Sequence, residues 1–91
     1  MTKRIGVVGI VVDEPHNVID KVNNIISDYR PLIIGRIGVP KPEEHVGLIA
    51  LIIDGDTDEI GAFTGKLGNL PGVTVKSALT TKKTSDKGDS K

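Results

Sequence analysis

Cysteine and tryptophan are absent from this 91-residue chain, and phenylalanine and tyrosine occur once each. Without cysteine the chain has no disulfide bonds, no thiolate ligands for zinc and no cysteine nucleophile. Its 12 basic side chains balance its 12 acidic ones, whereas proteins that bind nucleic acid carry a local excess of positive charge for the phosphates. These absences exclude cysteine chemistry and argue against direct binding of DNA or RNA.

Long apolar segments are also lacking. No apolar run approaches the ~20 residues that cross a bilayer. The short run over residues 5–12 could begin a signal peptide, but Asp13 and Glu14 follow it and a small-residue cleavage site does not. We therefore expect a cytoplasmic chain that does not enter a membrane.

What is present is enough apolar sequence for one small domain. Hydrophobic residues make up 37% of the chain, and the length fits a single domain. We expect residues 1–79 to form it. Residues 80–91 contain no apolar side chain and carry four Lys against two Asp, a net charge of +2, so we expect them to be a disordered polar tail.

Residues 4–12, which are apolar or glycine after the Arg4 cation, and the apolar run over residues 46–53 predict strands buried on both faces. Residues 32–38 and 73–79 are typical of edge strands. Apolar residues at helical spacing predict one helix from Pro15 to the Arg30-Pro31 pair, capped by Asp13 or Glu14. A second helix follows an Asp54-Gly55 turn, with Asp56 and Glu59 as a capping box.

The order strand, helix, strand, strand, helix, strand is typical of an α+β ferredoxin-like plait. This fold is a four-stranded antiparallel sheet in the order 4-1-3-2, with both helices on one face. The two fully apolar strands then lie at its centre. Because the helices cover only one face, the other face should expose more apolar surface than a monomer usually shows. We therefore expect a homo-oligomer, either a dimer or a tetramer.

Gly61, Gly65 and Gly68 fall within the second predicted helix, where each interior glycine costs ~1 kcal/mol relative to alanine. Two explanations are open. The glycines allow tight packing of this helix on its neighbour or on the sheet, which we favour, or they allow a ligand or a partner backbone to approach closely. Residues 61–67 do not form a phosphate loop, because the glycine spacing is too short and no Ser or Thr follows Lys66.

No other motif indicates catalysis or metal binding. The acidic residues at 54–59 begin like a calcium loop, but Gly65 stands where the bidentate Glu is required. His16 and His45 lack the spacing of a metal site. No Gly-x-Ser-x-Gly frame marks a nucleophile, and no two predicted helices follow one another as a helix-turn-helix requires. We expect no catalytic residue, no metal, no cofactor and no autonomous DNA-binding motif.

Three segments carry a resemblance: Arg4-Ile-Gly-Val-Val-Gly-Ile-Val-Val12, Ile34-Gly-Arg-Ile-Gly-Val-Pro40, and residues 58–73, in which a glycine-rich amphipathic helix runs into Pro-Gly-Val. Together they resemble small regulators of the iron-only hydrogenase system, over residues 4–79. The resemblance implies an ACT-like form of the plait, similar to the C-terminal domain of nickel-responsive repressors. It also implies association into dimers or higher oligomers and a regulatory role in hydrogen metabolism.

The resemblance leaves two functions open. In the first, the chain is a non-enzymatic regulator, transcriptional or post-translational, that acts through oligomerisation and a protein partner. The DNA-binding segment and the His and Cys ligands of nickel-responsive repressors are not matched. In the second, the chain is an ACT-like sensor of a small-molecule effector. Residues 12–18 resemble the turn that opens the ACT ligand site, with His16 in place of a glycine, and imply a site of Asp13, His16, Asn17 and Gly65 at a subunit interface.

Overall fold

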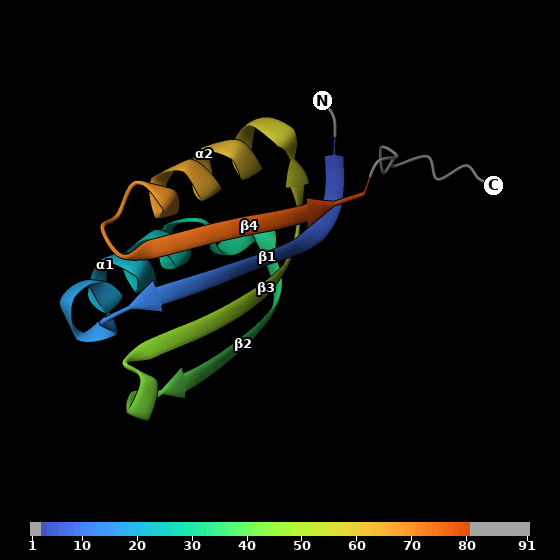
Figure 1. The fold of residues 1–91 in the computed structure, drawn as a ribbon. Coiled ribbons are helices and arrows are strands. Elements are labelled where there is room, and N and C mark those ends of the chain that lie inside the picture. Colours follow the sequence, from blue (N-terminus) through green and yellow to red (C-terminus); the bar gives the residue numbers. More distant parts are fainter. Residues whose placement is uncertain (1–2, 81–91) are drawn as a thin grey trace.

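A computed structural model describes residues 3–80 of the chain, which form a two-layer α+β domain of one sheet and two α-helices. The strands are β1 (Lys3–Asp13), β2 (Ile33–Lys41), β3 (Val46–Asp56) and β4 (Val73–Leu79), and the helices are α1 (Pro15–Asp28) and α2 (Thr57–Gly68). All neighbouring strands pair antiparallel in the order β2-β3-β1-β4. Both helices lie on the same side of this sheet (Figure 1). The predicted plait and its strand order are confirmed.

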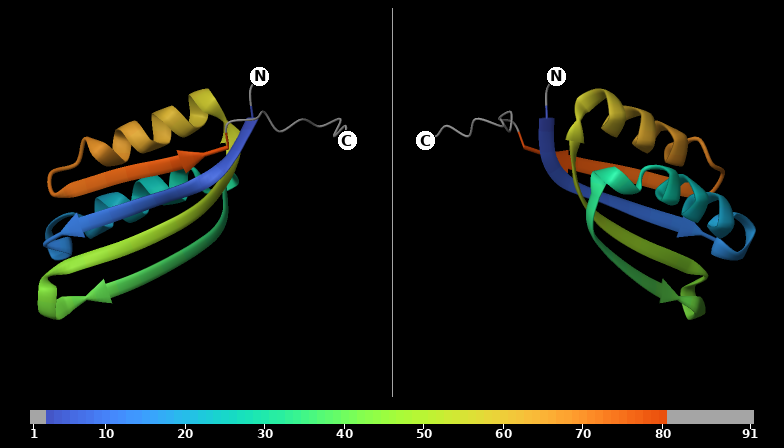
Figure 2. Two further views of the ribbon diagram at one scale, coloured as in Figure 1. Left: turned by 45° about the vertical axis from the view of Figure 1, so that its right-hand side comes forward. Right: turned by 180° about the vertical axis from the view of Figure 1, so that it is seen from behind.

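The core lies between the sheet and the layer of two helices on one side of it; Figure 2 shows these two layers from two further directions. Successive side chains of a strand point to opposite faces, so alternate residues of β1 and β3 reach the helices. Fully buried side chains come from all these elements: Val8, Ile10, Val12, Val22, Leu51, Ile53, Phe63 and Leu67. The Tyr29 ring, at the end of α1, lies 5.2 Å from the Phe63 ring of α2 between centroids. Apolar packing therefore joins both helices to the sheet.

The junction of β3 and α2 differs from the prediction at one point. The predicted turn at Asp54-Gly55 is wrong, because β3 continues to Asp56, which pairs with Lys3 of β1. The long N-terminal part of β1 gives these residues a pairing partner, and a turn has no reason to form. The predicted cap is confirmed at Asp56, whose carboxylate accepts a hydrogen bond from the Glu59 amide at 2.9 Å.

The start of α1 agrees with the prediction in position only. Glu14, one of the two predicted caps, is the N-cap residue, in the left-handed region with φ 50°, but its carboxylate makes no capping hydrogen bond. Backbone hydrogen bonds hold this turn instead: the Asp13 amide donates to the Gly72 carbonyl at 2.8 Å, and the Glu14 amide donates to the His45 carbonyl at 2.9 Å. Two neighbouring loops thus fix the position of the turn that precedes α1.

Pairing to β1 continues one residue past the predicted end of the domain at Leu79. The Thr80 amide donates to the Ile5 carbonyl at 2.9 Å, and the Thr80 hydroxyl accepts from the Ile5 amide at 3.3 Å. Arg4 Nη1 donates to the Thr80 carbonyl at 2.8 Å. Thr80 therefore belongs to the folded part of the chain. The rest of the predicted tail, residues 81–91, lies outside the described residues.

Candidate functional site

The sheet face turned away from the helices is an apolar surface, which we call the open face. Its large side chains alternate with the buried ones and are 38 to 65% exposed: Ile5, Val7 and Val11 of β1, Ile37 and Val39 of β2, and Leu48 and Ile52 of β3. Side chains of this size are normally buried when a partner surface is available. The structure thus shows the exposed apolar patch that the sequence predicts.

Antiparallel pairing arranges the open face in transverse rows, each with one residue from β2, β3, β1 and β4. The first row is Val39, Leu48, Val11 and Thr74; the second is Ile37, Ala50, Gly9 and Lys76; the third is Gly35, Ile52, Val7 and Ala78. The second row has its smallest residues, Ala50 and Gly9, at the middle of the sheet. A hollow of about 290 Å³ lies over them.

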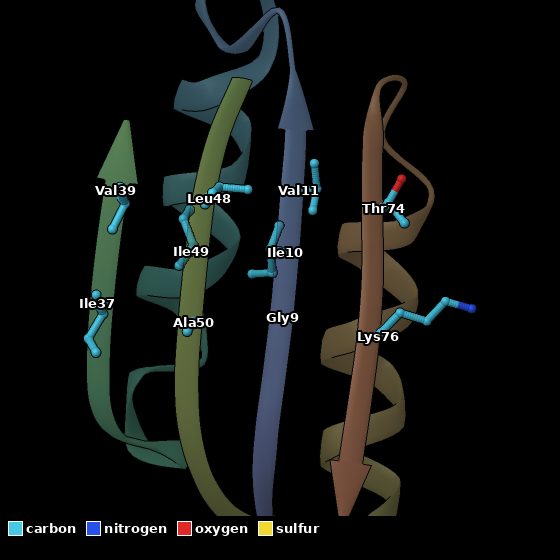
Figure 3. A pocket seen from close by; sticks show the side chains of 10 residues that line it. All are labelled: Gly9, Ile10, Val11, Ile37, Val39, Leu48, Ile49, Ala50, Thr74 and Lys76. Atoms are coloured by element: carbon cyan, nitrogen blue, oxygen red, sulfur yellow. The ribbon is translucent and has the colours of Figure 1, made fainter. Parts of the chain in front are cut away.

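The hollow is lined almost entirely by apolar groups. Lys76 is the one charged residue among those that line it, and Thr74 carries the one hydroxyl group. Both belong to β4, so the polar groups lie along one margin, while Ile37, Leu48 and Val11 border the rest (Figure 3). No acid–base pair or activated nucleophile lines this hollow. Its chemistry suits contact with another apolar surface.

A second groove, of about 450 Å³, runs between α2 and the edge strand β4. Gly61, Gly65 and Gly68 line it, and a Cβ atom built on any of the three would meet no atom within 4 Å. The explanation that we favoured from the sequence, tight packing of these glycines on a neighbouring helix or on the sheet, is therefore wrong within a single chain. The glycine stripe faces open space beside β4.

The predicted effector site divides into two places. Asp13 ends β1, and His16 and Asn17 lie in the first turn of α1, so these three exposed residues share one turn. Gly65 lies on α2 in the groove beside β4, which none of the other three lines. Within one chain the structure therefore groups three of the four residues; because the predicted site lies at a subunit interface, its completion by Gly65 stays a prediction.

A further groove, of about 310 Å³, lies beside the same turn, between α1 and β2. Pro15 and Ile19 line it from α1, and Arg36 lines it from β2. Arg36 Nη2 donates to Asn23 Oδ1 at 3.1 Å, which positions a cation at the groove. Sequence reasoning missed Arg36 and Asn23. The only available signal was a lone arginine within the Ile-rich β2 segment, and nothing in the pattern pairs it with α1.

Lys66 is the one titratable residue of the described chain with a clear pKa shift. Its Nζ lies 5.1 Å from the centroid of the Tyr29 ring. The pKa of Lys66 is raised, chiefly because it donates a hydrogen bond to the Tyr29 side chain and interacts electrostatically with it, and also because of the Asp28 charge. Lys66 therefore stays protonated at neutral pH and cannot serve there as a general base.

Nowhere among residues 3–80 do three or more His, Asp or Glu side chains gather as they would around a metal ion. Neither helix in this part of the chain has the length and apolar character to span a bilayer.

Comparisons with known proteins agree on one family. A family model described as "TM1266-like: Iron-only hydrogenase system regulator, putative" matches residues 4–77. The chain is similar in structure to the uncharacterized protein TM1266 of Thermotoga maritima, with a TM-score of 0.81 and 36% identity, over 85% of this chain and 96% of that one. Curated proteins give no match.

The fold is shared more widely. The ACT domain of GTP pyrophosphokinase from Chlorobium tepidum has a TM-score of 0.65 and 19% identity, over 90% of this chain and 91% of that domain. At this identity the likeness concerns the fold alone. The ACT-like form of the plait, expected from the sequence, is thereby confirmed.

Proposed function

Because the chain belongs to the TM1266-like family of iron-only hydrogenase system regulators, we propose that it is a non-enzymatic module that regulates this system by association. It associates with itself, as a dimer or tetramer, and with a protein partner through which it acts on transcription or on the enzyme. A cytoplasmic location, expected from the sequence, is part of the proposal.

The observation that carries this proposal is the open face. Seven large apolar side chains on one surface favour contact with protein, and the hollow at their centre offers no group for acid–base or nucleophilic chemistry. The balanced charge of the chain disfavours contact with DNA phosphates without a partner. Surface association is the activity that these features support.

Deletion of the coding sequence in a host that carries an iron-only hydrogenase tests the proposed role. We expect altered hydrogen production, restored by the wild-type sequence and not by Ile37→Asp, which places a charge on the open face. Hydrogenase transcript and activity per enzyme molecule, measured together, distinguish transcriptional from post-translational regulation. Unchanged transcript and unchanged activity would contradict the role.

A mobility-shift assay tests the need for a partner. The purified chain alone should not bind DNA from a hydrogenase promoter in a sequence-specific way. Specific binding requires contacts to base edges, and no predicted motif supplies them. Specific binding that persists at high salt would contradict this part of the proposal.

The groove between α1 and β2 favours a second candidate function, that of an effector sensor. It lies beside the turn of Asp13, His16 and Asn17, and Arg36 gives it a fixed cation suited to an anionic ligand. A thermal-shift screen of amino acids, nucleotides and divalent metals tests this function. A ligand at 100 times its Kd adds ~2.7 kcal/mol of stability. The shift should be lost in Arg36→Gln and kept in Lys76→Gln; absence of any shift would contradict the sensor function.

A further inference from the structure

The open face has a shape that fits a second copy of itself. We propose that two chains stack face to face about a twofold axis that runs parallel to the strands, directly over β3. In this arrangement β2 of each chain lies across β1 of the other. The inference rests on the proposed function by association, and it specifies the surface and the alignment through which the chain pairs with itself.

The distribution of apolar residues places the axis. In these three rows, every residue contributed by β2, β3 and β1 is apolar or glycine, whereas β4 contributes Thr74, Lys76 and Ala78; the next row, in which Ile5 pairs with Asp54, lies outside this apolar part. The apolar part is therefore centred on β3 and not on the middle of the sheet. An axis over β3 covers the three apolar strands and leaves β4 of each copy at the margin, with the Lys76 ammonium in water.

The second and third rows show the matching shapes. A twofold axis along the strands keeps each row in place and exchanges β2 with β1. In the second row, Ile37, which is 65% exposed, then lies over Gly9 of the second copy. In the third row, Val7 lies over Gly35 of the second copy. In these two rows the large side chain contributed by β2 or β1 thus faces a glycine on the other copy, whereas in the first row Val39 lies over Val11.

Gly9 is not required by the packing of its own chain. A Cβ atom at Gly9 would meet only the Lys76 carbonyl, at 3.9 Å, which is an ordinary contact. Glycine within a strand weakens it and often marks a site that another group approaches closely. The Ile37 side chain of a second copy is such a group, and it would fill the hollow over Gly9 and Ala50.

The other aligned stacking is unfavourable. A twofold axis across the strands, through the second row, would place each residue of that row over its own copy. Lys76 would then face Lys76, Ile37 would face Ile37, and Gly9 would face Gly9. Like charges would meet and two glycines would leave a void, so both electrostatics and packing favour the axis along the strands.

The covered surface sets the expected strength. Three strands at ~4.8 Å spacing, over the five residues from Val7 to Val11 at ~3.3 Å each, give a contact of about 14 by 17 Å on each copy. This is well below the ~800 Å² per partner of a standard specific interface, so the association should be weak, in the high micromolar range. Residues 81–91 do not suit this face, because they contain no apolar side chain.

Sedimentation equilibrium of the full chain, across a hundredfold range of micromolar concentrations, tests the arrangement. Ile37→Ala removes the projecting side chain and Gly9→Val fills its position on the other copy. Each should weaken self-association at least tenfold. The double variant exchanges large and small and should recover most of the loss. Thr74→Val, on the uncovered strand, is the control and should match the wild type. Far-UV circular dichroism confirms that each variant is folded.

The outcomes separate this inference from the proposed function. Self-association that none of the open-face variants alters would overturn the stacking but leave association intact, with the glycine groove beside β4 as its place. If both single variants associate more weakly and the double variant does not regain the affinity, the alignment of β2 over β1 is wrong. A wild-type chain that is a monomer at every concentration would overturn both the stacking and the oligomeric part of the proposed function. Regulation through a different protein would then still be tested by the deletion experiment.

Discussion

The two sides of β1 and β3 have nearly the same composition but different surroundings. On the inner side, Val8, Val12 and Leu51 are fully buried under the helices, whereas on the open face Val7, Val11 and Ile52 are 38 to 45% exposed. Sequence alone does not tell the two sides apart, since the large side chains on both are Val, Ile and Leu. The difference shows that two helices supply enough cover for one face only. The inner side therefore holds the fold, and the open face is available for association.

The largest difference in stability between the inner side and the open face should appear when a charge is introduced at two neighbouring positions of β1, one on each side. Val12→Asp puts an unpaired carboxylate into the core, which costs several kcal/mol and is comparable to the stability of a small domain. Val11→Asp puts the same charge in water on the open face. Circular dichroism should show an unfolded Val12→Asp chain and a folded Val11→Asp chain, and an unfolded Val11→Asp chain would contradict the assignment of the faces.

Shortening a side chain on each side should give a smaller contrast. Leu51→Ala opens a cavity in the core and should lower the free energy of unfolding by about 2 to 5 kcal/mol. Ile52→Ala, one residue later on the open face, should lower it by less than about 1 kcal/mol in dilute solution, because it leaves no internal cavity. Urea titration at protein concentrations too low for self-association measures the unfolding free energy of both variants. Equal losses at the two positions would show that the open face is covered within one chain.

The same contrast extends to α2, whose inner side carries Phe63 and Leu67 and whose outer side carries glycines. Gly65→Ala should raise the free energy of unfolding by about 1 kcal/mol, because alanine favours the helix and its Cβ meets no atom within 4 Å. Urea titration at low concentration gives the monomer value. A destabilised Gly65→Ala chain would show that another group already occupies the groove.

The smallest effect concerns the exposed Lys66 beside Tyr29. Folding raises the pKa of Lys66, so its contribution to stability is fully present below the unfolded value of about 10.4 and is lost as pH rises through the folded value. The difference in unfolding free energy between the wild type and Lys66→Gln should stay constant from about pH 6 to 9 and shrink above about pH 10.5. A difference that grows with pH would contradict the interaction.

Much of this fold could be predicted because its main signals are local. The apolar runs of β1 and β3 mark central strands, and the Asp56 carboxylate lies only three residues from the Glu59 amide that donates to it. Contacts between distant segments could not be predicted in the same way. The extension of β3 past Asp54 depends on the length of β1, and the start of α1 depends on carbonyl groups of Gly72 and His45.

The candidate site was less predictable for a related reason. The exposed apolar face follows from strand patterns and helix count, so it could be expected. The rows that set Ile37 beside Gly9 depend on register across three strands, which sequence periodicity does not fix. Gly65 was grouped with Asp13, His16 and Asn17 from a resemblance to a subunit interface, and within one chain it lies in a different groove.

The hydrogen bonds between Ile5 and Thr80 have a consequence for how this domain can be connected. They hold the first and last strands together at one corner, opposite the end where the loops of Asp13, His45 and Gly72 meet. A linker from Thr80 to Lys3 would close the chain at this corner, and new ends can be opened at the exposed Pro42–Glu44 turn. Circular permutation should therefore preserve the domain, and such a chain could carry fused labels at its far end while the original corner stays closed.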